Sequence, residues 1–248
     1  MRKSFTVLVV LLLAGTAGGT PVHAQSTAHL SLFNLQTNTF PAMSAGLDSF
    51  DSSGNFIAGL AAEQITLLED GQPRPVNTLQ ETQPGAQLVL ALDPGLTFSY
   101  QDAHAVSRFK KIVQAIQDWA ATHADSLGDD LSLLPTGENP STHLAETAVF
   151  SAALTAYLPN WETATSSLDT LAHALDVVSE PTSQAGMTRV ILYITSLPTE
   201  DATATIEQLT QRAVDLQVRV NVWMVASQNY AKQSGTTALQ DLALLTYG

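Results

Sequence analysis

Strand-length apolar runs alternate with helical segments from residue 86 to the end of the chain, and this alternation limits the possible folds more than any other feature. The runs with the length and composition of buried strands are AQLVLALD at 86–93, DLSLLP at 130–135, RVILYIT at 189–195 and VRVNVWMV at 218–225. Apolar residues at helical spacing predict helices over 102–124, 165–178 and 202–216, and a last helix from residue 236. This order predicts an α/β fold with an open, doubly wound, mostly parallel sheet flanked by helices.

Two segments of this region have a mixed pattern. THLAETAVF at 142–150 predicts either a short additional strand or the start of a helix. In VRVNVWMV, Arg219 and Asn221 alternate with apolar residues, which predicts a strand nearer the edge of the sheet.

Residues 25–85 have a different pattern, with short extended segments, turn residues and no long helical periodicity. FPAMSAGLDSFDSSGNFIAGL predicts a strand, a polar turn at 51–55 and a return strand. QITLLEDGQPRPVNTLQ predicts a hairpin with its turn at Asp70-Gly71, and Pro73 and Pro75 place its second strand at an edge. We therefore expect a small β-rich segment at 25–85 and an α/β domain at 86–248.

Residues 1–24 have the pattern of a signal peptide. Arg2 and Lys3 precede the apolar run FTVLVVLLLA, and Val22-His23-Ala24 is similar to a cleavage site with small residues. This pattern predicts export, with the mature chain secreted, periplasmic or at the cell surface. An uncleaved membrane anchor is the alternative, but it requires an apolar stretch of about 20 residues.

The charge balance argues against nucleic acids and anionic membranes as partners. The chain has 10 basic and 23 acidic residues, and loss of Arg2 and Lys3 with the signal peptide leaves eight against 23, a net charge of −15. Such a surface repels phosphates and anionic headgroups, so we expect neither nucleic-acid binding nor membrane contact by residues 25–248. The chain has no cysteine, which excludes disulfides, a thiolate nucleophile and a cysteine-ligated metal.

Segments in both parts of the chain resemble the von Willebrand factor type A (VWA) family, in an exported bacterial form with a small β segment before the A domain. GNFIAGLAAEQITLLEDGQPRPVNTLQ is similar to the G-x-x-V-x-G-L-x-x-x-D-F-x-x-x-E-D-G pattern found before such domains. Residues 86–248 follow the A domain's order of strands and helices. LQDLALLTYG resembles the segment that precedes the family's last strand and helix, so we expect this chain to lack those two elements.

The resemblance implies a place for a divalent cation, usually magnesium, at the carboxyl ends of the strands. Family ligands come from a D-x-S-x-S loop, from a threonine in a second loop and from an aspartate after the fourth strand. In this chain the first loop is DPGLT: Asp93 matches the aspartate, Gly95 replaces the first serine and Thr97 matches the second. TSSLDTLAHAL places Thr165 at the threonine, and YITSLPTED places Ser196 at the second aspartate.

This ligand set is incomplete, because only Asp93 carries a negative charge and magnesium normally requires carboxylate ligands to stay bound. We therefore predict a degenerate metal site, no resident cofactor, and a structural role for Asp93 in capping a helix or hydrogen-bonding Thr165. The alternative is a magnesium site in which Glu200 or Asp201 replaces the missing acid.

The sequence contains no arrangement typical of catalysis, since it has no G-x-S-x-G elbow, no H-x-x-x-H spacing and no phosphate-binding loop with lysine. We therefore predict an extracytoplasmic protein-interaction module, not an enzyme, that works without metal; a magnesium-dependent adhesion domain is the alternative. From another class, a secreted hydrolase using Asp93 with Glu200 or Asp201 is the competing hypothesis, because open α/β sheets bind ligands at strand ends.

The predicted interaction surface consists of the loops at 93–101, 135–141, 159–166 and 196–202. Gly95, Phe98, Trp161 and Glu200 are the candidate partner-binding residues in these loops. Trp161 is the candidate anchor, because aromatic side chains dominate the binding energy of many interfaces. The expected partner is a protein whose identity the sequence does not specify.

Overall fold

The computed structural model describes residues 7–10, 29–53, 55–82, 84–123, 128–182, 184, 186–196, 202–226 and 234–248. Contacts within the chain define two compact units, Met1–Gln83 and Pro84–Gly248. The larger unit contains every predicted site residue that the structure describes.

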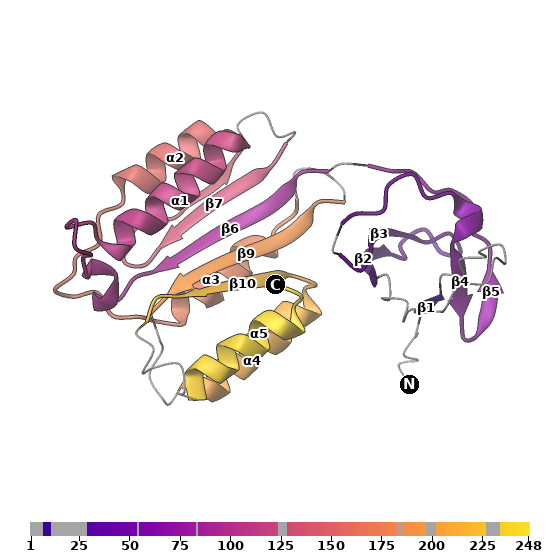
Figure 1. The fold of residues 1–248 in the computed structure, drawn as a ribbon. Helices are drawn as coiled ribbons and strands as arrows, with labels where there is room; N and C mark the ends of the chain where they lie inside the picture. Colours follow the sequence, from indigo (N-terminus) through magenta and orange to yellow (C-terminus); the bar gives the residue numbers. More distant parts are fainter. Residues whose placement is uncertain are drawn as a thin grey trace, which may run out of the picture. The chain divides into compact units, whose positions relative to one another are not determined.

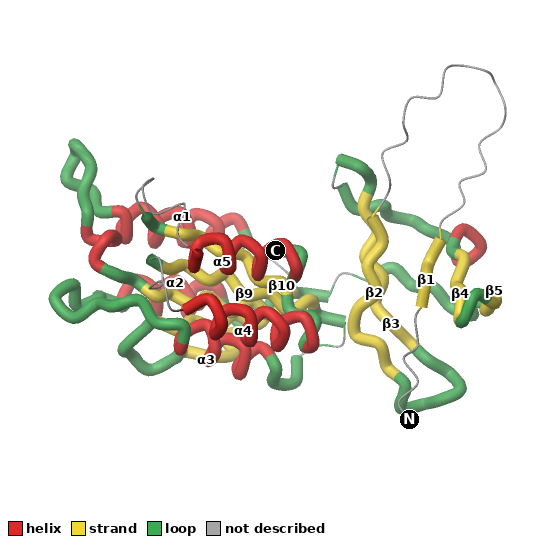
Figure 2. Tube along the Cα trace, turned by 90° about the horizontal axis from the view of Figure 1, so that it is seen from below, coloured by secondary structure: helices red, strands yellow, loops and turns green. Residues whose placement is uncertain are grey.

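The first unit consists of two small antiparallel sheets and a short 3-10 helix, Ala62–Gln64 (Figure 2). One sheet pairs β2 (His29–Gln36) with β3 (Ser44–Phe50). The other has the order β1-β4-β5, with β1 at Val7–Val10, β4 at Thr66–Glu69 and β5 at Gln72–Arg74. β1 thus falls within the predicted signal peptide, and it pairs with β4.

The two turns predicted in this unit have different outcomes. Asp70 and Gly71 form the hairpin turn with φ of 51° and 78°, and β5, which contains Pro73, lies at the sheet edge as predicted. Asp51 forms a polar turn, in which its Oδ1 accepts the N–H groups of Ser53 and Asn55. The return strand predicted after this turn is reduced to the bridge Phe50↔Phe56, because β3 pairs instead with β2.

The second unit contains a five-stranded sheet in the order β10-β9-β6-β7-β8. Its parallel strands are β6 (Ala86–Asp93), β7 (Asp130–Pro135), β9 (Thr188–Thr195) and β10 (Arg219–Met224). β8 (Ser141–Leu144) runs antiparallel to β7 at one edge, and β10 forms the other edge as predicted.

Helices cover both faces of this sheet (Figure 1). α1 (Arg108–Thr122) and α2 (Thr147–Ala156) lie on one face. α3 (Asp169–Val178), α4 (Thr203–Asp215) and α5 (Ser234–Leu245) lie on the other. The predicted mixed α/β fold, with helices around a mostly parallel sheet and a small β segment before it, is confirmed.

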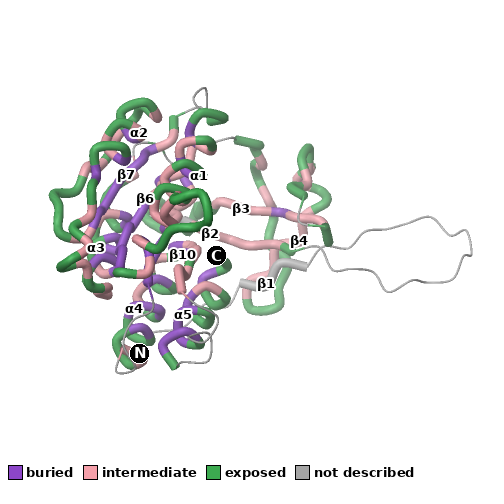
Figure 3. Tube along the Cα trace, turned by 60° about the vertical axis from the view of Figure 1, so that its left-hand side comes forward, coloured by how far each residue is buried: buried purple, intermediate pink, exposed green. Residues whose placement is uncertain are grey.

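The central strand β6 separates two apolar cores, because side chains of a strand alternate between the faces of its sheet. Val89 and Ala91 pack among residues of α3, α4 and α5, whereas Leu90 and Leu92 pack among residues of α1 and α2. The inner strands are buried and the loops at the strand ends are largely exposed (Figure 3). By the same alternation, Asp93 faces the α3 side of the sheet.

Local hydrogen bonds shift the predicted helix boundaries. α1 begins at Arg108, not near 102, because Ser107 caps it by accepting the N–H of Lys110 at 3.1 Å. The preceding turn is held by Asp102, whose Oδ1 accepts the N–H groups of His104 and Val106. THLAETAVF contributes to both of its predicted alternatives, since it forms most of β8 and then starts α2.

In the parts of the chain that the structure describes, we find no helix with the length and apolar character needed to span a membrane.

Truncation of a core leucine in α3 is expected to be far more costly than truncation of an exposed one. Leu175→Ala removes a fully buried side chain and should lower the free energy of unfolding by about 2–5 kcal/mol. Leu158→Ala, at an 80 % exposed residue, should change it by less than about 0.5 kcal/mol. Denaturant unfolding followed by circular dichroism measures both, and equal effects would contradict the assignment of the core.

Candidate functional site

Asp93 is the last residue of β6, where the chain leaves the sheet at Pro94. It pairs in register with Thr195 of β9, so both residues lie at the carboxyl edge of the sheet. Its exposed fraction is 0 %. A buried carboxylate is costly unless hydrogen bonds replace the water it has lost, so its partners define the site.

Five protein donors lie within 3.0 Å of the Asp93 carboxylate. Two approach Oδ1, from the Thr136 hydroxyl at 3.0 Å and the Ser167 backbone N–H at 3.0 Å. Three approach Oδ2, and these are the hydroxyls of Ser166 (2.8 Å), Thr195 (2.7 Å) and Tyr193 (3.0 Å). A carboxylate offers about four lone-pair sites, so the protein places enough donors around Asp93 to fill its accepting capacity.

These donors come from three separate segments that meet at Asp93. Thr136 begins the turn between β7 and β8, Ser166 and Ser167 precede α3, and Tyr193 and Thr195 lie on β9. The hydroxyls also contact one another, with Thr136 Oγ1 at 2.7 Å from Thr170 Oγ1 and Ser166 Oγ at 3.0 Å from Thr195 Oγ1. Asp93 therefore connects the end of β6 to the turn after β7, to the segment before α3 and to the end of β9.

Two tyrosines near the carboxylate are held in their neutral form. Burial, reinforced by the negative charge of Asp93, raises the pKa of Tyr193 well above its usual value. Burial also raises the pKa of Tyr157, again with the charge of Asp93 as the next cause, and its hydroxyl donates to the Thr136 carbonyl at 3.2 Å. Both phenols thus remain hydrogen-bond donors over the physiological range.

The two positions at which the sequence departs from the metal-binding pattern contact each other in space. The Ser196 hydroxyl lies 2.6 Å from that of Ser166, and a Cβ added to Gly95 would collide with Ser196 Oγ. Gly95 has φ of −108°, which any residue adopts, so this close approach is what requires a glycine there. Ser196 therefore fills the space that a side chain at 95 would need.

The other predicted ligands point elsewhere. The Thr97 hydroxyl donates to the Val225 carbonyl at 2.7 Å and makes no recorded contact with Asp93. Thr165 is exposed, and its neighbour Ser166 makes the contact with the carboxylate. Glu200 and Asp201 lie outside the described residues.

Sequence reasoning overlooked all five residues that donate to the Asp93 carboxylate, namely Thr136, Ser166, Ser167, Tyr193 and Thr195. A signal was available for the β9 pair, because Tyr193 and Thr195 are polar residues at alternate positions of an otherwise apolar strand. Alternation places both on one face, and pairing of β9 with β6 brings that face beside Asp93.

The predicted partner-binding aromatics, Phe98 and Trp161, pack in the core between the sheet and the helices α1 and α2. Phe98 is fully buried. Trp161 is half-buried and packs edge-to-face on Phe109 of α1, with ring centroids 5.5 Å apart. Phe109 makes a second edge-to-face contact with Tyr157, at 5.9 Å. Trp161 thus anchors the loop between α2 and α3 to α1, and only part of its side chain faces solvent.

The exposed apolar side chains at this end of the sheet are different ones. Leu96 and Tyr100, which follow β6, are 54 % and 52 % exposed, and Leu158, which follows α2, is 80 % exposed. Arg108 lies over the Tyr100 ring, with its guanidinium carbon 5.6 Å from the centroid. The loops around Asp93 therefore offer apolar contact area to solvent.

No family model matches the chain, and no curated protein matches it. Similar solved structures include an aerotolerance-related membrane protein from Bacteroides fragilis with multiple mutations to serines (17 % identity, TM-score 0.47, covering 66 % of this chain and 89 % of that one). Others are the conserved hypothetical protein BatB from Bacteroides thetaiotaomicron (14 %, 0.45, 66 % and 88 %) and proximal thread matrix protein 1 from the mussel byssus (10 %, 0.44, 67 % and 47 %). At these identities and TM-scores, the similarities do not indicate what this chain does.

Gly95→Ala is expected to destabilise the chain by displacing the Ser196 hydroxyl from its contact with Ser166, at a cost of about 1–3 kcal/mol. Ser196→Ala removes the colliding oxygen, so the double variant should be more stable than the sum of the two single effects predicts. Denaturant unfolding of the four proteins in this cycle gives the coupling energy. Strict additivity would show that the two positions do not contact each other.

Proposed function

We propose that this chain is an extracytoplasmic protein-interaction module with a VWA-like domain that works without a bound metal. The observation that carries the proposal is the saturated carboxylate of Asp93, at the position where the resemblance implies the principal cation ligand. Export rests on the signal-peptide pattern of residues 1–24.

Metal independence is supported by the competition that a cation would meet at Asp93. The hydroxyls of Ser166, Thr136 and Thr195 lie within hydrogen-bond distance of the carboxylate, so a cation would compete with them for its oxygen lone pairs. Among the described residues, no group of three or more His, Asp or Glu side chains is placed to hold a metal ion. Magnesium would have to displace several of these hydrogen bonds and would gain a single carboxylate.

An interaction role is supported by what surrounds the carboxylate. Three loops converge on Asp93, and their outer surface carries Leu96, Tyr100 and Leu158 with more than half of each side chain exposed. Exposed apolar side chains on loops that a rigid sheet positions are typical of partner-binding surfaces.

The hydrolase hypothesis receives no support from the geometry of Asp93. A general base must reach the proton it abstracts, but this carboxylate is fully buried and all its accepting capacity is used within the protein. Its predicted acidic partners, Glu200 and Asp201, lie outside the described residues.

Magnesium and manganese are expected to leave the protein unchanged. Calorimetric titration of either ion into the full chain should give no binding heat. The melting temperature should be the same in about 5 mM Mg²⁺, a large excess over the protein, as in EDTA. Asp93→Asn, which keeps the shape of the side chain and removes its charge, is the matched control. Micromolar binding that this substitution abolishes would establish the metal-dependent alternative.

Partner binding is expected to depend on the exposed apolar loops and not on cations. When the immobilised chain is tested against the secreted and surface proteins of its own cell, a specific partner should still be retained in EDTA. Combined Tyr100→Ser and Leu158→Ser should weaken its binding at least about tenfold, because each buried apolar side chain contributes about 1.5–3 kcal/mol.

Leu245→Ser is the matched control for this experiment, because Leu245 is 60 % exposed on α5 and distant in the fold from the loops around Asp93. Binding that the control weakens as much as the loop variants would place the interaction surface elsewhere, and loss of binding in EDTA would contradict metal independence.

A further inference from the structure

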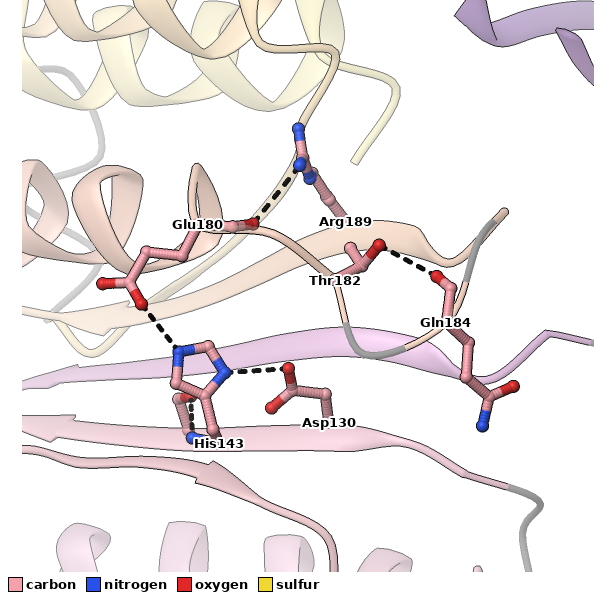
Figure 4. Close-up of polar contacts among 7 residues, drawn as sticks. Asp130, His143, Glu180, Thr182, Gln184 and Arg189 are labelled. Atoms are coloured by element: carbon pink, nitrogen blue, oxygen red, sulfur yellow. Dashed lines mark hydrogen bonds and ion pairs between the residues drawn. The ribbon is translucent and has the colours of Figure 1, made fainter. Parts of the chain in front are cut away.

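A second polar cluster lies at the amino ends of the parallel strands, away from Asp93 (Figure 4). Asp130 begins β7, and the antiparallel edge strand β8 brings His143 beside it. His143 Nδ1 lies 2.9 Å from Asp130 Oδ2, and His143 Nε2 lies 3.0 Å from Oε2 of Glu180, just beyond the end of α3. The imidazole therefore bridges three elements of the domain.

The geometry fixes the protonation state that this bridge requires. Each ring nitrogen faces a carboxylate oxygen, and an ionised carboxylate only accepts hydrogen bonds. Both nitrogens carry a proton only in the imidazolium form, so the two bonds form together only when His143 is positively charged. The same residue has φ of 56°, and its backbone N–H donates to the Ser132 hydroxyl at 3.1 Å. Its side-chain and backbone contacts thus hold it in a left-handed conformation that few residues other than glycine adopt.

Asp130 has few other partners. Its side chain is 4 % exposed, and its Oδ1 has no hydrogen-bond partner among the described residues. The amide of Gln87, which pairs with Asp130 in register on β6, is buried and also has no such partner. Arg189 of β9 donates through its Nη2 to the Glu180 carbonyl at 3.3 Å, and its buried Nε has no hydrogen-bond partner in the described part of the chain. His143 is therefore the cation in direct contact with the buried Asp130 carboxylate.

We propose that His143 is a pH-dependent latch, which in its charged form fastens the edge strand β8 to β7 and to the end of α3. The charged groups that face it are Asp130 from β7 and Glu180 from the segment after α3. Arg189 of β9 contacts the backbone carbonyl of Glu180. Loss of the ring proton removes one of the two bonds and leaves Asp130 buried without a counter-ion, which is costly.

The sign of the pH dependence follows from the same contacts. The hydrogen bond to Asp130, and after it that to Glu180, raises the pKa of His143 above its usual 6.5, although burial opposes this rise. The latch is then fully closed below pH 6.5 and opens as the pH rises through the higher pKa of the folded protein. Asp130 makes the larger contribution, because the Glu180 side chain is 55 % exposed and its bond is screened by solvent.

Hydrogen exchange of the full chain tests the latch in the strand that it holds. Between pH 6 and pH 9, the protection of peptides covering 136–146, corrected for intrinsic exchange, should fall at least about tenfold. His143→Asn keeps a residue that tolerates positive φ and removes the titrating ring, so its protection should be low and independent of pH. His104→Asn, in an exposed turn, is the matched control and should behave as the wild type.

Constant protection of the wild type over this range would overturn the proposal, and so would a pH dependence that His143→Asn retains. A nuclear magnetic resonance titration of the His143 ring in the wild-type chain provides a second measurement that does not depend on the variant folding. A pKa above 6.5 is expected, and a value at or below 6.5 would also overturn the latch.

Discussion

The structure of the larger unit depends on the compensation of one buried charge. Asp93 has lost its water, and the donors that replace water come from the turn after β7, the segment before α3 and strand β9. Each donor must be positioned by its own segment, so the requirement to satisfy one carboxylate fixes the relative positions of these three segments. Removal of the charge would take away the acceptor that all three share and leave only the weaker contacts among the hydroxyls themselves. Asp93 thus acts as the junction of these segments whether or not an ion ever binds beside it.

The fold could be predicted from sequence where local pattern and tertiary environment agree. The strands β6 and β7 match their largely apolar runs residue for residue, since a strand buried on both faces is mostly apolar. The start of α1 was predicted less accurately. The apolar periodicity continues through the turn held by Asp102, whereas the helix begins only after the cap at Ser107. At β3 the partner strand was the error, because the turn pattern at 51–55 predicts pairing with the segment that follows, whereas the strand pairs with β2, which precedes it.

The candidate site was predictable only in part, for a physical reason. A motif compares positions one at a time, so Gly95 and Ser196 counted as two losses from a metal-binding pattern. In three dimensions they are one arrangement, since the Ser196 hydroxyl occupies the space left by the absent side chain of Gly95. Likewise Thr165 matched the motif, but the main chain before α3 presents Ser166 to the carboxylate. Which of two adjacent hydroxyls faces inward depends on the loop conformation, which spacing does not encode.

The hairpin formed by β7 and β8 is held at both ends by buried aspartates, through Thr136 at Asp93 and through His143 at Asp130. Among the described strands, β8 is also an edge of the sheet. An exposed edge strand is a template for pairing with another chain, and short or irregular strands are poor templates. β8 has four residues and an irregular register with β7, so the hairpin held by these two aspartates presents little regular edge for another chain to extend.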